Sequence, residues 1–381
     1  MEMQPAAAVA FASVFVLGIC FAILGSIKLR LAEKLDIDDE KAGSLISALM
    51  FSSMIMILII GPMQDLLGYK PIAIVGFAAA GICLWLLAAA PSYGAALGAC
   101  LLLGVGAMCV NTSGNTLAPQ VMFGGDNPNA ALNLNNVFFG LGAFLTPLLV
   151  GKLIKKLGYK TAVSVFGAVC VVPILWAIPM SYPETQGFAF ADYINWITHP
   201  AVLVGGIALF CYIGLESSMG GFITTYLKDA GYEEDSAGNW LSGFWISLMI
   251  ARVVAALILS QVAVPGGAVI TGLAVLAIVA IGIMVTAETK KAGAVGTILA
   301  GLSFGPIFPT IVGVTYGKSA ASGSVFGLIF AIGLLGGVTV PYLIGRYSAR
   351  LTIRKSLKIA LGVAVLLTVI NLSLWLVVPA A

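Results

Sequence analysis

The feature that most constrains the fold is a series of apolar segments, each near the ~20 residues that a helix needs to cross the hydrocarbon of a bilayer. Of the 381 residues, 60% are hydrophobic and only 9% are charged. Lipid accepts apolar surface all round a helix, so the sequence predicts an all-α membrane protein with twelve transmembrane helices. The predicted spans are 6–28, 43–62, 71–90, 93–119, 130–151, 161–180, 201–227, 237–260, 266–287, 293–316, 322–344 and 357–378.

The composition also narrows the class of protein. A net charge of +3 is too small to indicate a nucleic-acid partner. The six cysteines lie within apolar segments and lack metal-type or redox spacing, so we interpret them as packing residues. No nucleophile constellation, metal-ligand cluster or phosphate loop occurs. We therefore predict no enzyme activity, no catalytic residue, no metal and no cofactor, and we expect a monomer whose partners are the lipid bilayer and a small molecule.

A polar stretch over residues 61–70 separates the second and third apolar segments. Its pattern is Gly-x-x-x-Asp-x-x-Gly-x-Lys, formed by Gly61, Asp65, Gly68 and Lys70, and its two charges are those of Asp65 and Lys70. The stretch resembles the loop between the second and third helices of major facilitator superfamily (MFS) transporters. Glycines let two helix ends approach closely, and an Asp can pair with a base or cap a neighbouring helix terminus. We predict a polar turn here, with a gating or structural role for Asp65 and Lys70.

An internal repeat supports a division into two halves. Residues 142–152 resemble residues 336–346, and Gly142 and Pro147 share one offset with Gly336 and Pro341. The repeat places span five on span eleven and predicts two pseudo-symmetric six-helix bundles with the substrate between them, the MFS fold. The predicted bundles are 1–185 and 201–381, joined by a central cytoplasmic connection over 186–200.

The resemblance can be narrowed within the superfamily. Four segments are similar to the fucose–galactose–glucose/proton symporters and the sodium-dependent glucose transporter-like proteins: 131–142, 212–216, Phe244-Trp245 with Arg252, and 305–310. Span one has no acidic residue, whereas fucose permease-type proteins use one there for proton coupling. The resemblance implies a sugar substrate and leaves the coupling ion open between H+ and Na+.

Two charged residues lie well inside the predicted spans, where each charge costs at least ~2.5–3.5 kcal/mol. Glu216 is roughly 24 Å along span seven at 1.5 Å per residue. A lone carboxylate there must pair, bind a cation or take up a proton, so Glu216 is the predicted coupling residue. The alternative is a permanent ion pair with Arg252, a residue near the far end of span eight for which we favour a structural or gating role.

Neutral polar and aromatic side chains are the predicted substrate ligands. An amide offers both donors and acceptors to sugar hydroxyl groups. Asn111 and Asn115 share one face of span four, as do Asn133 and Asn136 in span five, although helix–helix hydrogen bonding would explain any single Asn. Trp245 and Phe308 could stack on a sugar, or could simply pack. Pro306 and Pro309 predict a kink in span ten.

Two indicators of orientation disagree. The family resemblance places both termini and the central connection in the cytoplasm of the bacterial inner membrane. Yet 15 of the 19 Lys and Arg lie in connections on the opposite side, where the positive-inside rule does not expect them. These residues are Arg30, Lys34, Lys41, Lys152, Lys155, Lys156, Lys160, Lys228, Lys290, Lys291, Arg346, Arg350, Arg354, Lys355 and Lys358.

Together these features predict a secondary active transporter of a small polar solute, a sugar, working by alternating access with proton or sodium coupling. One alternative is an exporter of amphipathic small molecules, since the 12 Met and 19 Phe could line an apolar cavity. A second alternative, of another class, is a membrane sensor that keeps the MFS fold and does not transport. The sequence names neither the sugar nor the direction of transport.

Overall fold

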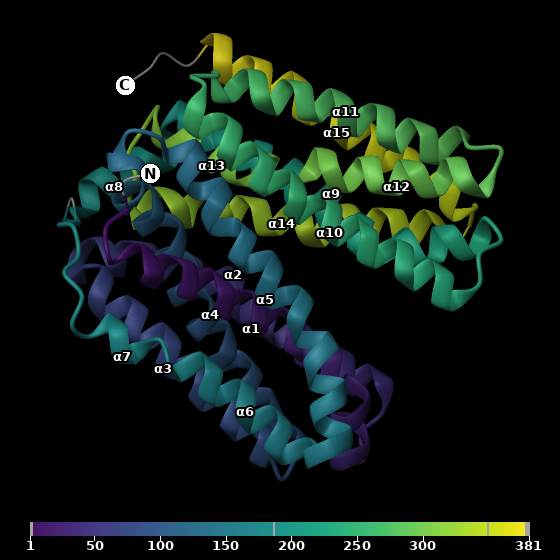
Figure 1. The fold of residues 1–381 in the computed structure, drawn as a ribbon, viewed down its shortest axis with the longest axis horizontal. Coiled ribbons are helices and arrows are strands. Elements are labelled where there is room, and N and C mark those ends of the chain that lie inside the picture. The colour runs from purple at the N-terminus through teal and green to yellow at the C-terminus, as the bar shows by residue number, and fades with distance from the viewer. Residues whose placement is uncertain (1–2, 186, 349, 378–381) are drawn as a thin grey trace. The chain divides into compact units, whose positions relative to one another are not determined.

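The computed structural model describes residues 3–185, 187–348 and 350–377, and its long elements are all α-helices (Figure 1). Within this described part of the chain, twelve helices are long and apolar enough to cross a membrane. The predicted all-α fold with twelve membrane spans is therefore confirmed. Contacts divide the chain into two compact units. Unit 1 comprises residues 1–126, 135–193 and 322–327, and unit 2 comprises 127–134, 194–321 and 328–381.

Unit 1 is built mainly from the helices before residue 193. These are α1 (Ala7–Leu35), α2 (Asp39–Leu67), α3 (Tyr69–Ala89), α4 (Tyr93–Val121), the 3₁₀ turn η1 (Phe123–Gly125), most of α5 (Pro128–Leu157), α6 (Tyr159–Val171) and α7 (Ile174–Ala177). The side chains of Asp38 and Ser92 accept backbone N–H bonds at the starts of α2 and α4. Such caps supply partners for amides that have none within the helix.

Unit 2 holds the remaining long helices, after the short α8 (Phe190–Thr198) in the central connection. They are α9 (Pro200–Asp229), α10 (Glu234–Gln261), α11 (Gly266–Thr286), α12 (Lys290–Phe304), α13 (Ile307–Tyr316), most of α14 (Gly323–Ser348), whose first turn belongs to unit 1, and α15 (Ile353–Val377). Together, α12 and α13 form one membrane span, interrupted at Gly305 and Pro306. The predicted kink in span ten is thus present, because a proline cannot donate to the helical hydrogen-bond ladder.

The prediction of a polar turn over residues 61–70 is wrong in its extent. Helix α2 continues through Pro62 to Leu67, and α3 begins at Tyr69, so that only Gly68 separates them. Gly68 has a φ of 88°, a conformation that a residue without a Cβ adopts easily. The sequence Leu67-Gly68-Tyr69-Lys70 recurs as Leu157-Gly158-Tyr159-Lys160. There Gly158 separates α5 from α6 and has a φ of 78°. As a consequence, Asp65 lies on a helix.

The two repeated segments make the same kind of helix contact in their own units. A Cβ on Gly142 of α5 would collide with the backbone oxygen of Phe15 in α1. A Cβ on Gly336 of α14 would collide with the backbone oxygen of Phe210 in α9. Small residues permit this close approach of helix backbones in membranes. In each unit, therefore, the repeated glycine marks a tight crossing of two helices.

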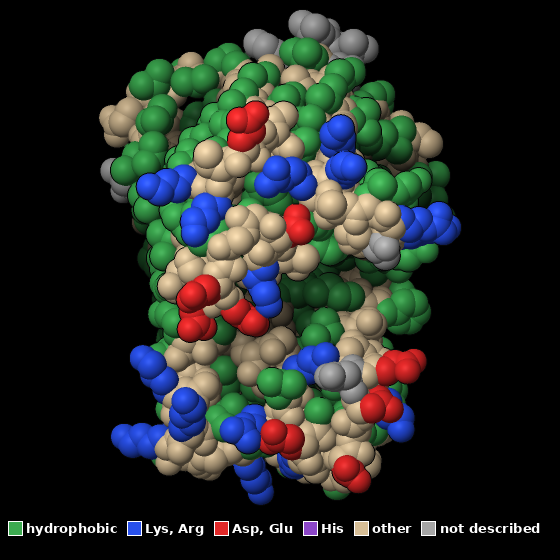
Figure 2. Space-filling view, turned by 90° about the vertical axis from the view of Figure 1, so that its right-hand side faces the viewer, with side chains coloured by type: hydrophobic (Ala, Val, Ile, Leu, Met, Phe, Trp, Pro, Cys, Tyr) green, Lys and Arg blue, Asp and Glu red, His purple; other side chains and the backbone are tan. Residues whose placement is uncertain are grey.

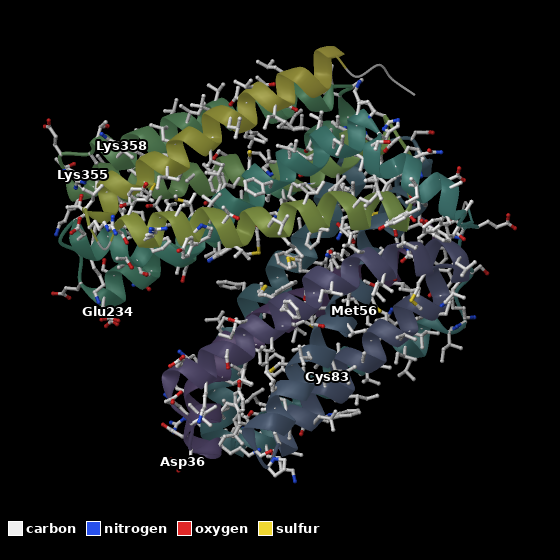
Figure 3. The ribbon with its side chains drawn as sticks, turned by 180° about the vertical axis from the view of Figure 1, so that it is seen from behind. Asp36, Met56, Cys83, Glu234, Lys355 and Lys358 are labelled. Atoms are coloured by element: carbon white, nitrogen blue, oxygen red, sulfur yellow. The ribbon has the colours of Figure 1, made fainter. Side chains whose placement is uncertain are left out.

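Charged side chains gather at the helix ends. Figure 2 shows many Lys and Arg side chains, together with several Asp and Glu side chains, on the face toward the viewer. In Figure 3, Glu234, Lys355 and Lys358 lie at the same end of unit 2, and Asp36 lies at an end of unit 1. Asp36 has a left-handed backbone and ends α1. The observed helix ends therefore keep these charges away from the middle of the helices.

Candidate functional site

Asparagine side chains of unit 1 form a hydrogen-bonded group between α4 and α5. The Nδ2 atom of Asn115 donates to Oδ1 of Asn111 at 2.9 Å, and Nδ2 of Asn136 donates to Oδ1 of Asn115 at 2.8 Å. All three side chains are buried. The structure thus brings together three predicted substrate ligands, and it places their amides in the interior of a membrane protein.

Asn133, the fourth predicted amide, belongs to unit 2. Its Nδ2 atom donates to the backbone oxygen of Asn129 at 2.9 Å and to Oγ1 of Thr310 in α13 at 3.2 Å. Its Oδ1 atom is buried and accepts no hydrogen bond from the described part of the chain. A buried acceptor without a donor is unfavourable, so this oxygen is able to take a hydroxyl donor from a ligand.

The two charges inside the membrane helices lie together in unit 2. Oε1 of Glu216 is 3.6 Å from Nη2 of Arg252, and it accepts a 2.8 Å hydrogen bond from the Tyr212 hydroxyl. Nη2 of Arg252 also donates to the Tyr212 oxygen at 3.4 Å. The Arg252 side chain is 2% exposed and that of Glu216 is 18% exposed. Within this pair, Glu216 is therefore the more exposed member.

Aromatic rings of unit 2 meet this charged group at Tyr212. Phe308 is buried, and its ring lies 6.0 Å from that of Tyr212 and 6.1 Å from that of Phe330. Trp245 is half-buried on α10, where it packs against Phe244 at 5.1 Å and lies beside Gly220. Of the two predicted stacking residues, Trp245 is therefore the more accessible, and Phe308 is part of an aromatic cluster.

Asp65 caps the start of α14 within unit 1. Its two carboxylate oxygens accept backbone hydrogen bonds from Gly323 at 2.7 Å and from Ser324 at 2.8 Å. The side chain is 4% exposed. A carboxylate at a helix N-terminus is stabilised by the free N–H groups and by the helix dipole. Lys70 is exposed and forms no ion pair with the described residues, so the structure supports the capping alternative for Asp65.

The sequence matches the Major Facilitator Superfamily over residues 9–341, which is most of its length. The chain belongs to this superfamily. One relative is the glucose/galactose transporter of Brucella abortus, which is 27% identical over 311 residues; the match covers 75% of this chain and 73% of the relative. Another relative is the putative glucose/galactose transporter of Helicobacter pylori, which is 24% identical over 300 residues; the match covers 72% of each chain.

Solved MFS structures share the fold along nearly the whole chain. The transporter FucP in its outward conformation aligns with a TM-score of 0.82 at 18% identity, covering 97% of this chain and 99% of FucP. The human organic anion transporter MFSD10 aligns with a TM-score of 0.77 at 15% identity, and the alignment covers 97% of this chain and 100% of MFSD10. At these identities the likeness concerns the fold.

Sequence reasoning missed a second polar group in this MFS protein, on another face of α4. Nε2 of Gln64 donates to Oγ1 of Thr116 at 2.6 Å, and Oγ of Ser113 donates to Oε1 of Gln64 at 3.0 Å. The spacing of Ser113 and Thr116 at i and i+3 was an available signal for one polar face. Gln64 was hidden because it fell within the predicted turn. These bonds hold the last turns of α2 against α4, next to Asp65.

Proposed function

We propose that the chain is a secondary active transporter that moves a sugar across the bacterial inner membrane by alternating access, coupled to a proton or a sodium ion. The observation that carries the proposal is the set of buried amide groups on membrane helices: Asn111, Asn115, Asn133 and Asn136. Amides match sugar hydroxyl groups as donors and acceptors, and they do so without the penalty of a buried charge.

The remaining ligands follow from the same chemistry. Trp245 stacks on the apolar face of a sugar ring, and Phe308 supports it within the aromatic cluster. Glu216 takes up the coupling ion, because it is the accessible member of the buried pair with Arg252. The relatives named glucose/galactose transporter and the solved Escherichia coli fucose:proton symporter, 19% identical with a TM-score of 0.79, support a monosaccharide and favour the proton.

The mechanical and topological parts of the proposal follow the superfamily. The bundles 1–185 and 201–381 move as two bodies around the substrate, and the protein works as a monomer with both termini in the cytoplasm. Fusions of a fluorescent protein or alkaline phosphatase to the C-terminus test the orientation. Fluorescence without phosphatase activity is expected, and the reverse would mean that the charge distribution, with its 15 basic residues at the other side, determines the topology.

Counterflow in proteoliposomes tests the function directly. Vesicles loaded with one unlabelled monosaccharide are diluted into the same labelled sugar, and the panel includes glucose, galactose and fucose. We expect saturable exchange of at least one sugar. Asn136→Ala is expected to raise the half-saturating concentration, because a ligand group is lost. Asn371→Ala is the matched control. Asn371 is another buried amide, its Nδ2 atom donates to the Gly267 oxygen and to Oγ1 of Thr271 on α11, and we assign it no ligand role.

The same vesicles separate the two alternatives. A membrane sensor would bind a sugar in a thermal-shift assay and would exchange none. An exporter of amphipathic molecules would show no exchange of monosaccharides and would exchange a hydrophobic cation. Either pattern contradicts the proposal.

A further inference from the structure

The break between α12 and α13 leaves a backbone carbonyl group without its helical donor. In an α-helix, the oxygen of Gly305 would accept from the amide of residue 309. Residue 309 is a proline and has no N–H group. The next amide, that of Thr310, donates to Pro306 at 3.1 Å. The Gly305 oxygen therefore depends on a partner from outside its own helix.

Arg252 is that partner. Its Nε atom donates to the Gly305 oxygen at 2.8 Å, while its Nη2 atom faces Glu216 and Tyr212. Helix α10 is held tightly at this point, because a Cβ on Gly305 would collide with the backbone oxygen of Leu248. One buried guanidinium thus joins the carboxylate of α9 to the broken point of span ten.

The helix beyond the break carries Phe308 of the candidate substrate site and Thr310, which is a hydrogen-bond partner of Asn133. Phe308 packs on Tyr212 at 6.0 Å, and Thr310 holds the Asn133 amide at 3.2 Å. The Tyr212 ring also lies 6.3 Å from Phe304, so it contacts residues on both sides of the break. A change in the position of α13 would therefore move the surroundings of Asn133 together with the aromatic cluster.

We propose that Arg252 is the positioning residue through which the charge of Glu216 controls the α12–α13 break. While Glu216 is ionised, it holds Arg252 on the Gly305 oxygen and keeps the break in its present geometry. When a coupling cation neutralises Glu216, the buried guanidinium loses its carboxylate partner, a strongly unfavourable situation. Arg252 then leaves its present position, and the Gly305 carbonyl and α13 are released. This inference rests on the proposed coupling role of Glu216.

Few other charges lie near Glu216. Among the described residues, its partners are Arg252 on α10 and Tyr212 on its own helix. Helix α13 contains no charged residue, and the other charges of the helices around it lie near helix ends. They are Lys228 and Asp229 in α9, Glu234 and Asp235 in α10, Lys290 and Lys291 in α12, Arg346 in α14, and Arg354, Lys355 and Lys358 in α15. A response of α13 to the coupling cation can therefore be assigned to the Glu216–Arg252 pair.

Hydrogen–deuterium exchange on the purified full-length protein tests the proposal. Amides of residues 307–316 are followed at low and high pH, and at constant pH with and without sodium chloride. Amides of α3 serve as the internal reference, because intrinsic exchange rises with pH everywhere. In the wild type, we expect the cation that couples to speed exchange in α13 by roughly tenfold, within the usual range of coupling between sites. The effect is expected to be lost in Glu216→Gln.

Pro309→Ala provides the sharper variant. Alanine restores an amide at position 309, so the Gly305 oxygen gains a helical donor and no longer depends on Arg252. We expect α13 to exchange slowly in this variant whether or not the cation is present. Pro341→Ala, at the proline inside α14, is the matched control and should respond as the wild type does. A wild-type response in Pro309→Ala or in Glu216→Gln would overturn the proposal.

The outcome is separable from that of the proposed function. If no sugar is exchanged in vesicles but α13 responds to the cation through Glu216, the transport proposal fails and the role of Arg252 stands. If sugar is transported and α13 does not respond, the role of Arg252 is refuted and the transport proposal stands.

Discussion

Replacing Asp65 by Asn tests how strongly the α2 carboxylate holds the start of α14. In the wild type, the two carboxylate oxygens accept N–H bonds of 2.7 and 2.8 Å from Gly323 and Ser324. A hydrogen bond to a charged group contributes about 1.5–3 kcal/mol, and a partly buried charge at a helix terminus adds up to about 2 kcal/mol. The Asn side chain keeps one oxygen that accepts a hydrogen bond. An NH2 group replaces the second oxygen, and this donor then faces the second backbone N–H group, which is also a donor.

The expected loss is one charge-assisted bond together with most of the interaction with the helix dipole, about 3 kcal/mol in all. At roughly 2–4 °C per kcal/mol, as for domains of 150–250 residues, the unfolding midpoint should fall by roughly 6–12 °C. A thiol-reactive fluorescent maleimide measures this midpoint, because the six cysteines are free and buried and become reactive only on unfolding.

Lys70→Gln is the matched control for this prediction. Lys70 lies in the first turn of α3 and is exposed, so removing its charge should shift the midpoint by less than about 1–2 °C, as is usual for surface substitutions. The reasoning is refuted if Asp65→Asn unfolds at the wild-type temperature. A fall of equal size in Lys70→Gln would also refute it, because the charge pattern of the segment would then matter more than the cap.

Three further predictions concern packing, the amide group and pH. Gly336→Val should prevent the close contact with Phe210 and abolish folded protein in size-exclusion chromatography, whereas Gly151→Val, in open space, should not. Asn115→Ala removes the bonds that link Asn111 and Asn136, and should weaken sugar binding in a thermal-shift titration by about tenfold or more, equivalent to ~1.4 kcal/mol. Burial raises the pKa of Tyr182 from 10.0 to about 12, so the stability contributed by its neutral hydroxyl is present below pH 10 and is lost as pH rises through 12. Tyr182→Phe should therefore reduce the loss of unfolding free energy between pH 10 and 12. The same pH dependence in Tyr182→Phe and the wild type would be contrary evidence.

The sequence predicted the membrane spans well because lipid imposes a length and a composition on each of them. It failed at residues 61–70, where Gly61-Pro62 resembled a helix end. In a membrane helix a proline is tolerated, and the left-handed Gly68 is the residue that ends α2. The position of Asp65 on a helix follows from that difference. Its partner at the start of α14 lies more than 250 residues away and has no local signal.

For the candidate site, residue types and helix faces could be predicted from the sequence, whereas most hydrogen-bond partners could not. The possible pairing of Glu216 with Arg252 was recognised because two opposite charges in apolar spans have few other options. Pro309 predicted a kink, but the contact of Arg252 with Gly305 depends on the packing of α10 against α12. Similarly, the stripe of Asn133 and Asn136 was visible, while their separate partners, Thr310 and Asn115, required the structure.

The central claim is that Glu216 couples an ion to the movement of a sugar, and Glu216→Gln tests it most directly. Gln keeps the shape and the hydrogen bond with Tyr212, but it cannot be ionised. Proteoliposomes with an imposed proton or sodium gradient are assayed for sugar accumulation and, in parallel, for counterflow. Glu234→Gln is the matched control, because Glu234 is an exposed carboxylate in an ion pair with Lys228.

We predict that the wild type and Glu234→Gln accumulate sugar against its gradient. Glu216→Gln should lose accumulation and retain counterflow, since exchange requires no net movement of the ion. Should Glu216→Gln fail to insert, the double variant Glu216→Gln/Arg252→Gln shows whether the charges serve only to neutralise each other, in which case expression returns. Accumulation by Glu216→Gln at the wild-type level would contradict the account.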